Sequence, residues 1–242
     1  LAVAPDHRLD LLHRFGNNIT TNNGAVSLTA NETLANGVVN AQRDPGAAVI
    51  TMAAGTTINA GNANISITLS DGAGLTNSTS GNITIANLTT TGQALIRNLG
   101  PSFGSGIAQQ PDSVITADKL LAVANNGSVV LDNFTLPASA HLVNTLAGSA
   151  RGEFKFKNGQ SLEIGTVALV NGITVVGASP ATIDINVTSG GLTVNKNITA
   201  TGGSSGEATI TLTAQSGSIN VTTPVSLSQT LIEAIGGPVG EG

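Results

Sequence analysis

The chain has 242 residues, of which 40% are hydrophobic and 10% are charged, with a net charge of −5 at neutral pH. Its nine Lys and Arg residues are scattered along the chain and form no basic patch for nucleic acid. The absence of cysteine excludes disulfides, cysteine-bound zinc and a thiol nucleophile. No apolar run reaches the roughly 18 residues that a membrane span requires. Charged residues are far below the usual fraction of about 25%, so Asn, Thr, Ser and Gly must supply the polar surface.

The first 16 residues differ from the rest of the chain. They contain His7 and His13, and their leucines have helix-like spacing, so the sequence predicts an atypical lead-in at 1–16, either a short helix or an irregular end. No signal peptide is recognisable there. Because the chain begins without Met, we expect it to be a piece of a longer protein.

From Asn17 onward, short stretches of alternating apolar and polar residues are separated by turns rich in Asn and Gly. Alternation with a period of two places one set of side chains on one face of a strand. Ile50, Ile67 and Ile85 are spaced by 17 and 18 positions, whereas Val129 and Phe154 are 25 apart. The early repeats are therefore expected to be shorter than the later ones.

The clearest repeat lies between residues 181 and 227. Ile185 and Ile210 are 25 positions apart, and so are Val194 and Ile219, so a three-strand unit is present twice in tandem. A strand unit repeated at a fixed period is typical of a β-solenoid, in which the core grows along one axis. We predict an all-β solenoid over residues 17–228, with roughly ten rungs spaced about 4.8 Å apart.

Two segments interrupt the repeat, at 100–118 and 134–141. The first contains Phe103 and shows no alternation before Val114, so both are predicted to be loop insertions. Such loops either carry recognition or act as plain connectors. The tail, 229–242, is expected to be a short helix or a truncated rung.

The sequence contains no catalytic motif. A G-x-S-x-G elbow is absent, and the three His residues (His7, His13 and His141) are isolated from one another. The glycine-rich stretch at 202–207 lacks the lysine of a phosphate-binding loop. We therefore predict no catalytic residue, no metal ligand and no cofactor site.

Polysaccharide cleavage is the strongest enzymatic alternative, because it requires clustered carboxylates and often a basic residue. Lys155, Lys157 and Glu163 are expected to lie near one another on adjacent strands, either as part of a site or as a solvated face with a weak ion pair. The other candidate carboxylates are single and irregularly spaced: Asp112, Asp118, Asp132, Glu153 and Asp184.

Asn-x-Ser/Thr triplets are frequent, and they have two interpretations. They are glycosylation acceptors in a secreted protein, or they arise wherever an Asn turn enters a Thr-containing strand. Repeated use of Asn-Ile-Thr as a strand opening favours the second interpretation. The triplets begin at Asn18, Asn31, Asn64, Asn77, Asn82, Asn87, Asn126, Asn133, Asn186, Asn197 and Asn220.

Several stretches resemble the repeat region of filamentous-haemagglutinin-like exoproteins, large bacterial adhesins of the two-partner secretion type. They include GNITI, GSVVLDN, EFKFKNGQSLEIGTV, GGLTVNKNITATGG and TLTAQSGSINV. The resemblance covers roughly residues 17–228 and implies a right-handed parallel β-helix that is secreted or on the bacterial cell surface. The Asn-Pro-x-Gly signature of that family's secretion domain is absent from this sequence.

The sequence and the resemblance together predict a non-enzymatic shaft segment of an adhesin that acts in attachment. The expected partners are glycans or proteins of host or neighbouring cells, and an outer-membrane transporter for the parent protein. Nucleic acid and a membrane span within this chain are not expected. Two alternatives are a β-helical polysaccharide lyase or hydrolase and a purely structural repeat without a partner.

Overall fold

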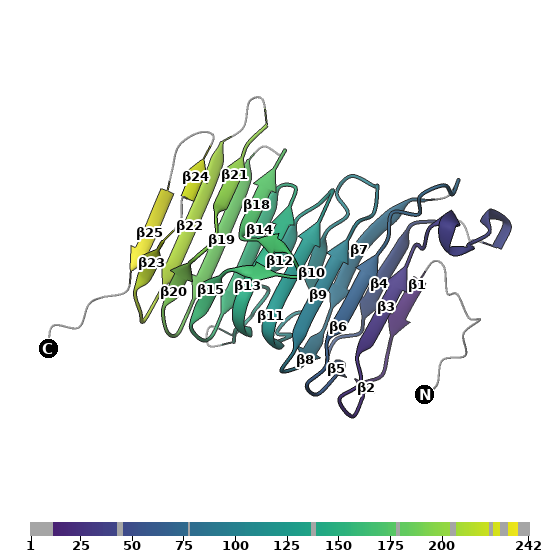
Figure 1. Cartoon of the computed structure of the whole chain (residues 1–242), viewed down its shortest axis with the longest axis horizontal. Coiled ribbons are helices and arrows are strands. Elements are labelled where there is room, and N and C mark those ends of the chain that lie inside the picture. The colour runs from purple at the N-terminus through teal and green to yellow at the C-terminus, as the bar shows by residue number, and fades with distance from the viewer. Residues whose placement is uncertain are drawn as a thin grey trace, which may run out of the picture.

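Alternating apolar residues form parallel strands that stack into a β-solenoid in the computed structural model (Figure 1). The structure describes residues 12–42, 46–76, 78–136, 139–177, 180–203, 207–222, 225–227 and 232–236. For 12–15, 42, 225–227 and 232–236 the description covers the backbone alone. The strands lie side by side along the long axis of the molecule, and this arrangement confirms the predicted all-β solenoid.

Sheet A contains nine strands within the described residues, and all neighbouring strands in it are parallel. In order along the axis they are β1 (Leu12–Phe15), β4 (Ala48–Met52), β7 (Ser80–Ile85), β10 (Ile107–Gln109), β12 (Val129–Leu131), β14 (Glu153–Asn158), β19 (Ala181–Val187), β22 (Ala208–Ala214) and β25 (Ile232–Gly236). Each pass of the chain through sheet A begins a new rung.

Sheet B consists of two columns that the long strands β11 (Ile115–Ala124) and β13 (Leu142–Ala150) join. The first column also contains β2 (Ile19–Thr20), β5 (Thr57–Asn59), β8 (Asn87–Thr89), β15 (Leu162–Ile164), β20 (Leu192–Val194) and β23 (Ile219–Val221). The second contains β3 (Val26–Ala30), β6 (Ile65–Leu69), β9 (Gln93–Asn98), β18 (Ile173–Val176), β21 (Ile198–Thr201) and β24 (Val225–Leu227).

Small elements decorate the stack. An antiparallel hairpin of β16 (Thr166–Val167) and β17 (Val170–Asn171) lies against β13. Two 3-10 turns, η1 (Leu34–Asn36) and η2 (Asn40–Gln42), follow β3. None of the helical turns within the described ranges is long and apolar enough to cross a membrane.

The inward side chains form a hydrophobic cluster that runs from Val26 to Ala214. Along β19 and β22, every second residue is buried and the residues between them are partly exposed. Aliphatic residues dominate this interior, and Phe154 and Phe156 are fully buried within it. Burial of such surface stabilises a fold by about 25 cal/mol per Å².

The predicted spacing of 25 positions in the last repeats is wrong. Ile183 pairs with Ile210, and Leu192 pairs with Ile219, so the spacing there is 27 positions. A shift of two residues leaves the same side chains facing inward, so alternation alone does not determine the register. The spacing of 25 between Val129 and Phe154 is confirmed.

The short early repeats are also not found. Ile50 pairs with Ile83 in sheet A, and Ile67 pairs with Ile96 in sheet B, so these rungs are longer than predicted. The spacing of 17 measured the step from β4 in sheet A to β6 in the second column of sheet B, and the spacing of 18 measured the step from β6 to β7, which begins the next rung. Similar strands in different columns cannot be told apart by their period.

The predicted boundaries differ from the observed strands in several places. β1 lies within the lead-in 1–16 and pairs with β4, while residues 1–11 lie outside the described residues. β25 lies within the tail 229–242 and pairs with β22, which matches the truncated rung and not the short helix. The right-handed winding remains a prediction.

The interruption at 100–118 is shorter than predicted. It includes β10 and the start of β11, so the chain is irregular from Gly100 to Gly106 and again between these strands. The apolar residues of β10 are too few for a visible alternation. Within 134–141 the described residues contain no strand beyond an isolated bridge between His141 and Asn158.

Candidate functional site

The outer face of sheet A brings together residues that are far apart in the sequence. Ala108 of β10 is in register with Val130 of β12, which is in register with Lys155 of β14, and Lys155 is in register with Asp184 of β19. This row begins as an apolar strip and continues as a charged one. A hollow lies over the apolar part, and a group of carboxylates lies over the charged part.

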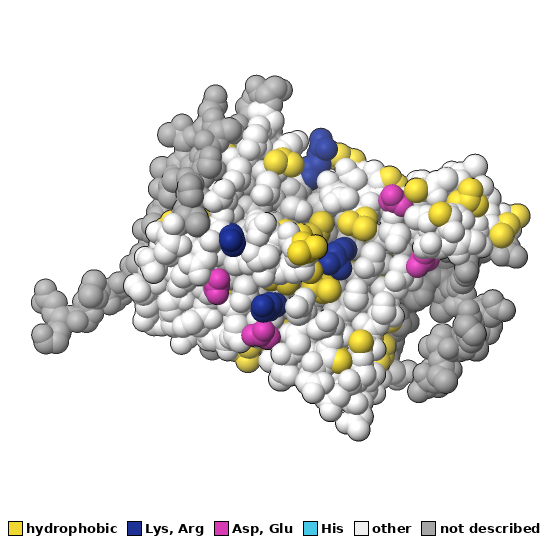
Figure 2. Space-filling view, in the orientation of Figure 1, with side chains coloured by type: hydrophobic (Ala, Val, Ile, Leu, Met, Phe, Trp, Pro, Cys, Tyr) yellow, Lys and Arg dark blue, Asp and Glu magenta, His cyan; other side chains and the backbone are white. Residues whose placement is uncertain are grey.

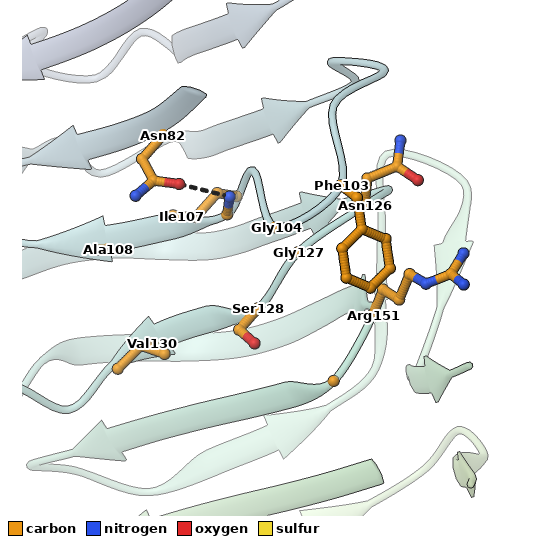
Figure 3. A pocket seen from close by; sticks show the side chains of 12 residues that line it. Asn82, Phe103, Gly104, Ile107, Ala108, Asn126, Gly127, Ser128, Val130 and Arg151 are labelled. Carbon is orange, nitrogen blue, oxygen red and sulfur yellow. Dashed lines mark hydrogen bonds between the residues drawn. The ribbon is translucent and has the colours of Figure 1, made fainter. Parts of the chain in front are cut away.

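The hollow, which we call the Phe103 hollow, has a volume of about 310 Å³. Its lining includes Phe103, Arg151, Asn82, Ala108 and Val130 (Figure 3). In Figure 3, the ring of Phe103 and the side chain of Arg151 lie together at one end, and Asn82 and Val130 lie towards the other. The hollow therefore combines an aromatic ring, a cation, an amide and an apolar floor.

Serine contacts hold the loop that carries Phe103. The Oγ of Ser102 accepts a hydrogen bond from the backbone N–H of Ser80 at 2.8 Å, and the Oγ of Ser105 donates to the carbonyl of Ser80 at 2.8 Å. Asn126 of the next rung donates through Nδ2 to the carbonyl of Gly100, also at 2.8 Å. These bonds attach the loop to the rungs on both sides.

Two glycines allow this loop geometry. Gly104 has a φ of 85°, which a residue with a side chain adopts only with strain. Gly127 lies so close to Ser105 that an added Cβ would approach the Ser105 backbone to 2.4 Å. The glycines therefore allow Phe103 to be displayed on a tightly stacked rung.

Arg151 lies in the two-residue turn between β13 and β14, and its backbone N–H donates to the carbonyl of Gly127 at 2.8 Å. Its guanidinium carbon is 5.0 Å from the centroid of the Phe103 ring, in a cation–π contact. The Nε atom is buried and has no hydrogen-bond partner, and Arg151 makes no ion pair with any residue in the described ranges. Its positive charge is therefore not neutralised by a carboxylate there.

The second feature is the carboxylate group, which we define as Asp132, Glu153 and Asp184 around Lys155. The Nζ of Lys155 is 3.0 Å from the Oε1 of Glu153, and both side chains are partly exposed. Asp132 directly follows β12, and Asp184 lies on β19, in register with Lys155. The lysine thus lies on the strand between the two aspartates.

Burial raises the pKa of Asp132 above its ordinary value, and the positive charge of Lys155 opposes this effect. Burial also raises the pKa of Asp184, the carboxylate of Asp132 raises it further, and Lys155 again opposes the rise. Half-buried carboxyls with raised pKa values and a neighbouring lysine are suited to proton transfer.

The remaining carboxylates lie apart from this group. The side chain and backbone of Thr135 donate hydrogen bonds to Asp112 and lower the pKa of its carboxyl. Asp118 accepts a hydrogen bond from Asn144 at 3.0 Å. No cluster of three His, Cys, Asp or Glu residues suited to a metal ion occurs in the part of the chain that the structure describes.

Glu163 is not beside Lys155 and Lys157, in contrast to the sequence-based expectation. It lies on β15 in sheet B, where its Oε1 accepts a hydrogen bond from Asn195 at 3.0 Å. The two lysines lie on β14 in sheet A. The turn after β14 carries the chain into a different column, so residues close in sequence end on different faces.

His141 is a buried structural residue. Its Nδ1 accepts a hydrogen bond from the backbone N–H of Ile115 at 2.9 Å, so its Nε2 carries the proton and donates to Gln109 Oε1 at 2.9 Å. The imidazole stacks on Phe156 and meets the ring of Phe134 edge-on. Burial lowers the pKa of His141 to about 3, so the ring is neutral and not placed to act on a substrate.

Several Asn residues of the Asn-x-Ser/Thr triplets have structural contacts. Asn31 is fully buried. The side chain of Asn82 accepts a hydrogen bond from the N–H of Gly106 at 2.8 Å, and that of Asn87 accepts one from the N–H of Val114 at 2.9 Å. These bonds join one rung to the next and favour the structural interpretation. Asn77 lies outside the described residues.

The hairpin of β16 and β17 covers a second apolar cluster outside the main core. Val167 and Val170 pack there with Leu121 and Ala147, and the hairpin tip exposes 94% of Leu169. The face in Figure 2 shows few charged side chains, with hydrophobic ones gathered near its middle. The apolar cluster beneath β16 and β17 holds the hairpin on the solenoid.

Comparisons with models of protein families, with curated proteins and with solved structures found no match. The features that bear on function are the solenoid itself, the Phe103 hollow and the carboxylate group. Sequence reasoning noted Phe103 as part of an interruption, but it did not single out Arg151. One available signal was an arginine two positions before the EFKFKN strand, in a chain with only nine Lys and Arg residues.

Proposed function

We propose that this chain is a structural shaft segment of a large secreted or cell-surface bacterial adhesin, and that it acts in attachment. The observation that carries this proposal is the hydrophobic core that runs along the solenoid from Val26 to Ala214. A rod of this kind holds binding surfaces away from the cell that produces it. The resemblance of its repeats to filamentous-haemagglutinin-like exoproteins supports the same role.

The physical basis of the rod is the direction of its backbone hydrogen bonds. These bonds join each strand to the rungs on either side, so they lie along the long axis and act together against bending or stretching. The low fraction of charged residues also limits repulsion between neighbouring rungs. Glycans or proteins of other cells are the proposed partners, and an outer-membrane transporter is the proposed route of the parent protein.

Two measurements on the whole chain test this proposal. Small-angle scattering should give an elongated particle, and beads coated with the chain should bind to host or bacterial cells more than albumin-coated beads do. A compact particle would contradict the rod. An elongated particle without any gain in bead retention would contradict the role in attachment.

A second candidate function is cleavage of a polysaccharide, and the carboxylate group is the observation that favours it. One aspartate with a raised pKa is a suitable general acid, and the second is a suitable base or nucleophile. Lys155 between them is placed to stabilise developing negative charge.

Release of new chain ends from a panel of polysaccharides tests this second function. Asp132→Asn and Asp184→Asn should each abolish the release, whereas Asp118→Asn, on sheet B, should leave it unchanged. A wild-type chain without activity on the panel, or full activity in both variants, argues against an enzyme.

A further inference from the structure

We propose that the Phe103 hollow binds a sugar ring that carries a carboxylate, such as a uronic acid unit of a polysaccharide. The ring of the sugar would lie on Phe103, and its carboxylate would pair with the guanidinium of Arg151. This inference deepens the proposed role in attachment by naming a ligand class, and it rests on that role for its biological setting.

The ring of Phe103 is exposed, so the stability of the fold does not account for an aromatic residue at this position. The chain has five Phe residues, and Phe154 and Phe156 are fully buried, whereas 76% of Phe103 is exposed. The Ser80 and Asn126 contacts nevertheless attach its loop to the rungs on both sides. An exposed aromatic ring on a fixed loop is a preorganised platform, which lowers the entropy that binding costs.

Arg151 supplies the anion specificity. The neighbouring carboxylate of Glu153 is engaged by Lys155, and Arg151 itself has no ion pair among the described residues. The planar guanidinium matches a carboxylate through two parallel hydrogen bonds. Its Nε–H, now buried without an acceptor, would gain one if the side chain turned from Phe103 towards the carboxylate.

The rest of the lining fits a sugar better than an acidic peptide. Ala108 and Val130 form an apolar floor, while Asn82, Asn126 and Ser128 bring amide and hydroxyl groups to the edge. A pyranose has an apolar face of C–H groups and a rim of hydroxyls, so it complements both parts. A volume of about 310 Å³ lies at the lower end of the range for ligand pockets, which suits a single ring better than a folded segment.

Titration calorimetry on the full chain tests the proposal with short oligomers of galacturonate, glucuronate and mannuronate. At least one of these should bind, and its methyl ester, which keeps the ring but loses the charge, should bind at least about tenfold more weakly. A short polyglutamate serves as the probe for carboxylates without a sugar ring and should not compete.

Two substitutions connect the binding to the site. Arg151→Gln and Phe103→Ala should each weaken binding by roughly tenfold or more, and Arg151→Lys should rescue it only in part, because lysine lacks the bidentate fork. Lys157→Gln removes one positive charge from the same face, and Leu136→Ala removes an exposed apolar side chain from a neighbouring loop. Both controls should bind as the wild type does.

Three outcomes would overturn the site. These are no binding of any of the three uronate oligomers, equal binding of acid and methyl ester, and an equal loss in Lys157→Gln and Arg151→Gln. Competition by polyglutamate would assign the hollow to acidic peptides instead. The ester comparison requires no variant, so it decides the matter even if a variant unfolds. If the particle is elongated but binds none of the uronate oligomers, the proposed binding site is rejected and the shaft proposal is unaffected.

Discussion

The two faces of sheet A belong to the same strands but differ in how much their side chains vary from rung to rung. Inward residues such as Ile183, Ile185 and Ile210 form uniform files of aliphatic side chains. Outward residues change from rung to rung, from Ala108 and Val130 to charged side chains. The comparison shows that stacking depends on one half of each strand, so the other half is available for binding or chemistry.

The largest expected effect comes from placing a charge in the interior. Ile210→Asp should lower the free energy of unfolding by about 5 kcal/mol or prevent folding, because it loses buried apolar surface and leaves a carboxylate without a partner. Thr213→Asp, on the outward face of the same strand, should cost less than about 1 kcal/mol. Denaturant unfolding measures both, and similar losses would contradict the division between the faces.

The phenylalanines allow a second test of the same division. Phe156→Ala should destabilise the chain by about 3–5 kcal/mol, because it leaves a cavity in the core and removes the ring on which His141 stacks. Phe103→Ala removes an exposed ring and should change stability by no more than about 0.5 kcal/mol. A large loss in Phe103→Ala would mean that the ring supports its loop instead of a ligand.

His141 predicts a dependence of stability on pH. Its pKa is about 3 in the folded chain and about 6.5 when exposed, so between these values the unfolded state binds more protons. The free energy of unfolding therefore has its full value above about pH 6.5. It decreases as the pH falls, by about 2 kcal/mol at pH 5, because the unfolded state gains a proton on His141. His141→Gln should show a flatter dependence in denaturant unfolding across this window. An unchanged slope would contradict the buried neutral ring.

The smallest effect is expected at the carboxylate group. Lys155→Gln should raise the pKa of both Asp132 and Asp184, because the positive charge of Lys155 lowers both. A carboxyl whose pKa is raised by folding destabilises the fold once ionised, so the variant should lose less than about 1 kcal/mol at neutral pH. Carbon NMR of the side-chain carboxyls measures the titrations. Lys119→Gln, on sheet B, is the control and should leave them unchanged.

The sequence by itself determined which residues face inward. The alternation around Ile183, Val194 and Ile210 predicts strands with one buried side, and that side is buried in the structure. The recurrence of similar strand units also predicted stacking, because no isolated three-strand unit buries its apolar face alone. This information is local, since each strand encodes its own face in consecutive residues.

Only the tertiary structure decided the register and the two outer features. A shift of two residues preserves every inward side chain, so the true pairing of Ile183 with Ile210 depends on how the turns close. Phe103 and Arg151 meet because the loop that enters β10 and the turn that enters β14 lie at the same end of the hollow. Asp132, Lys155 and Asp184 come together because the parallel pairing of β12, β14 and β19 places them on successive rungs. Proximity across rungs is a property of the stack, and no short stretch of sequence encodes it.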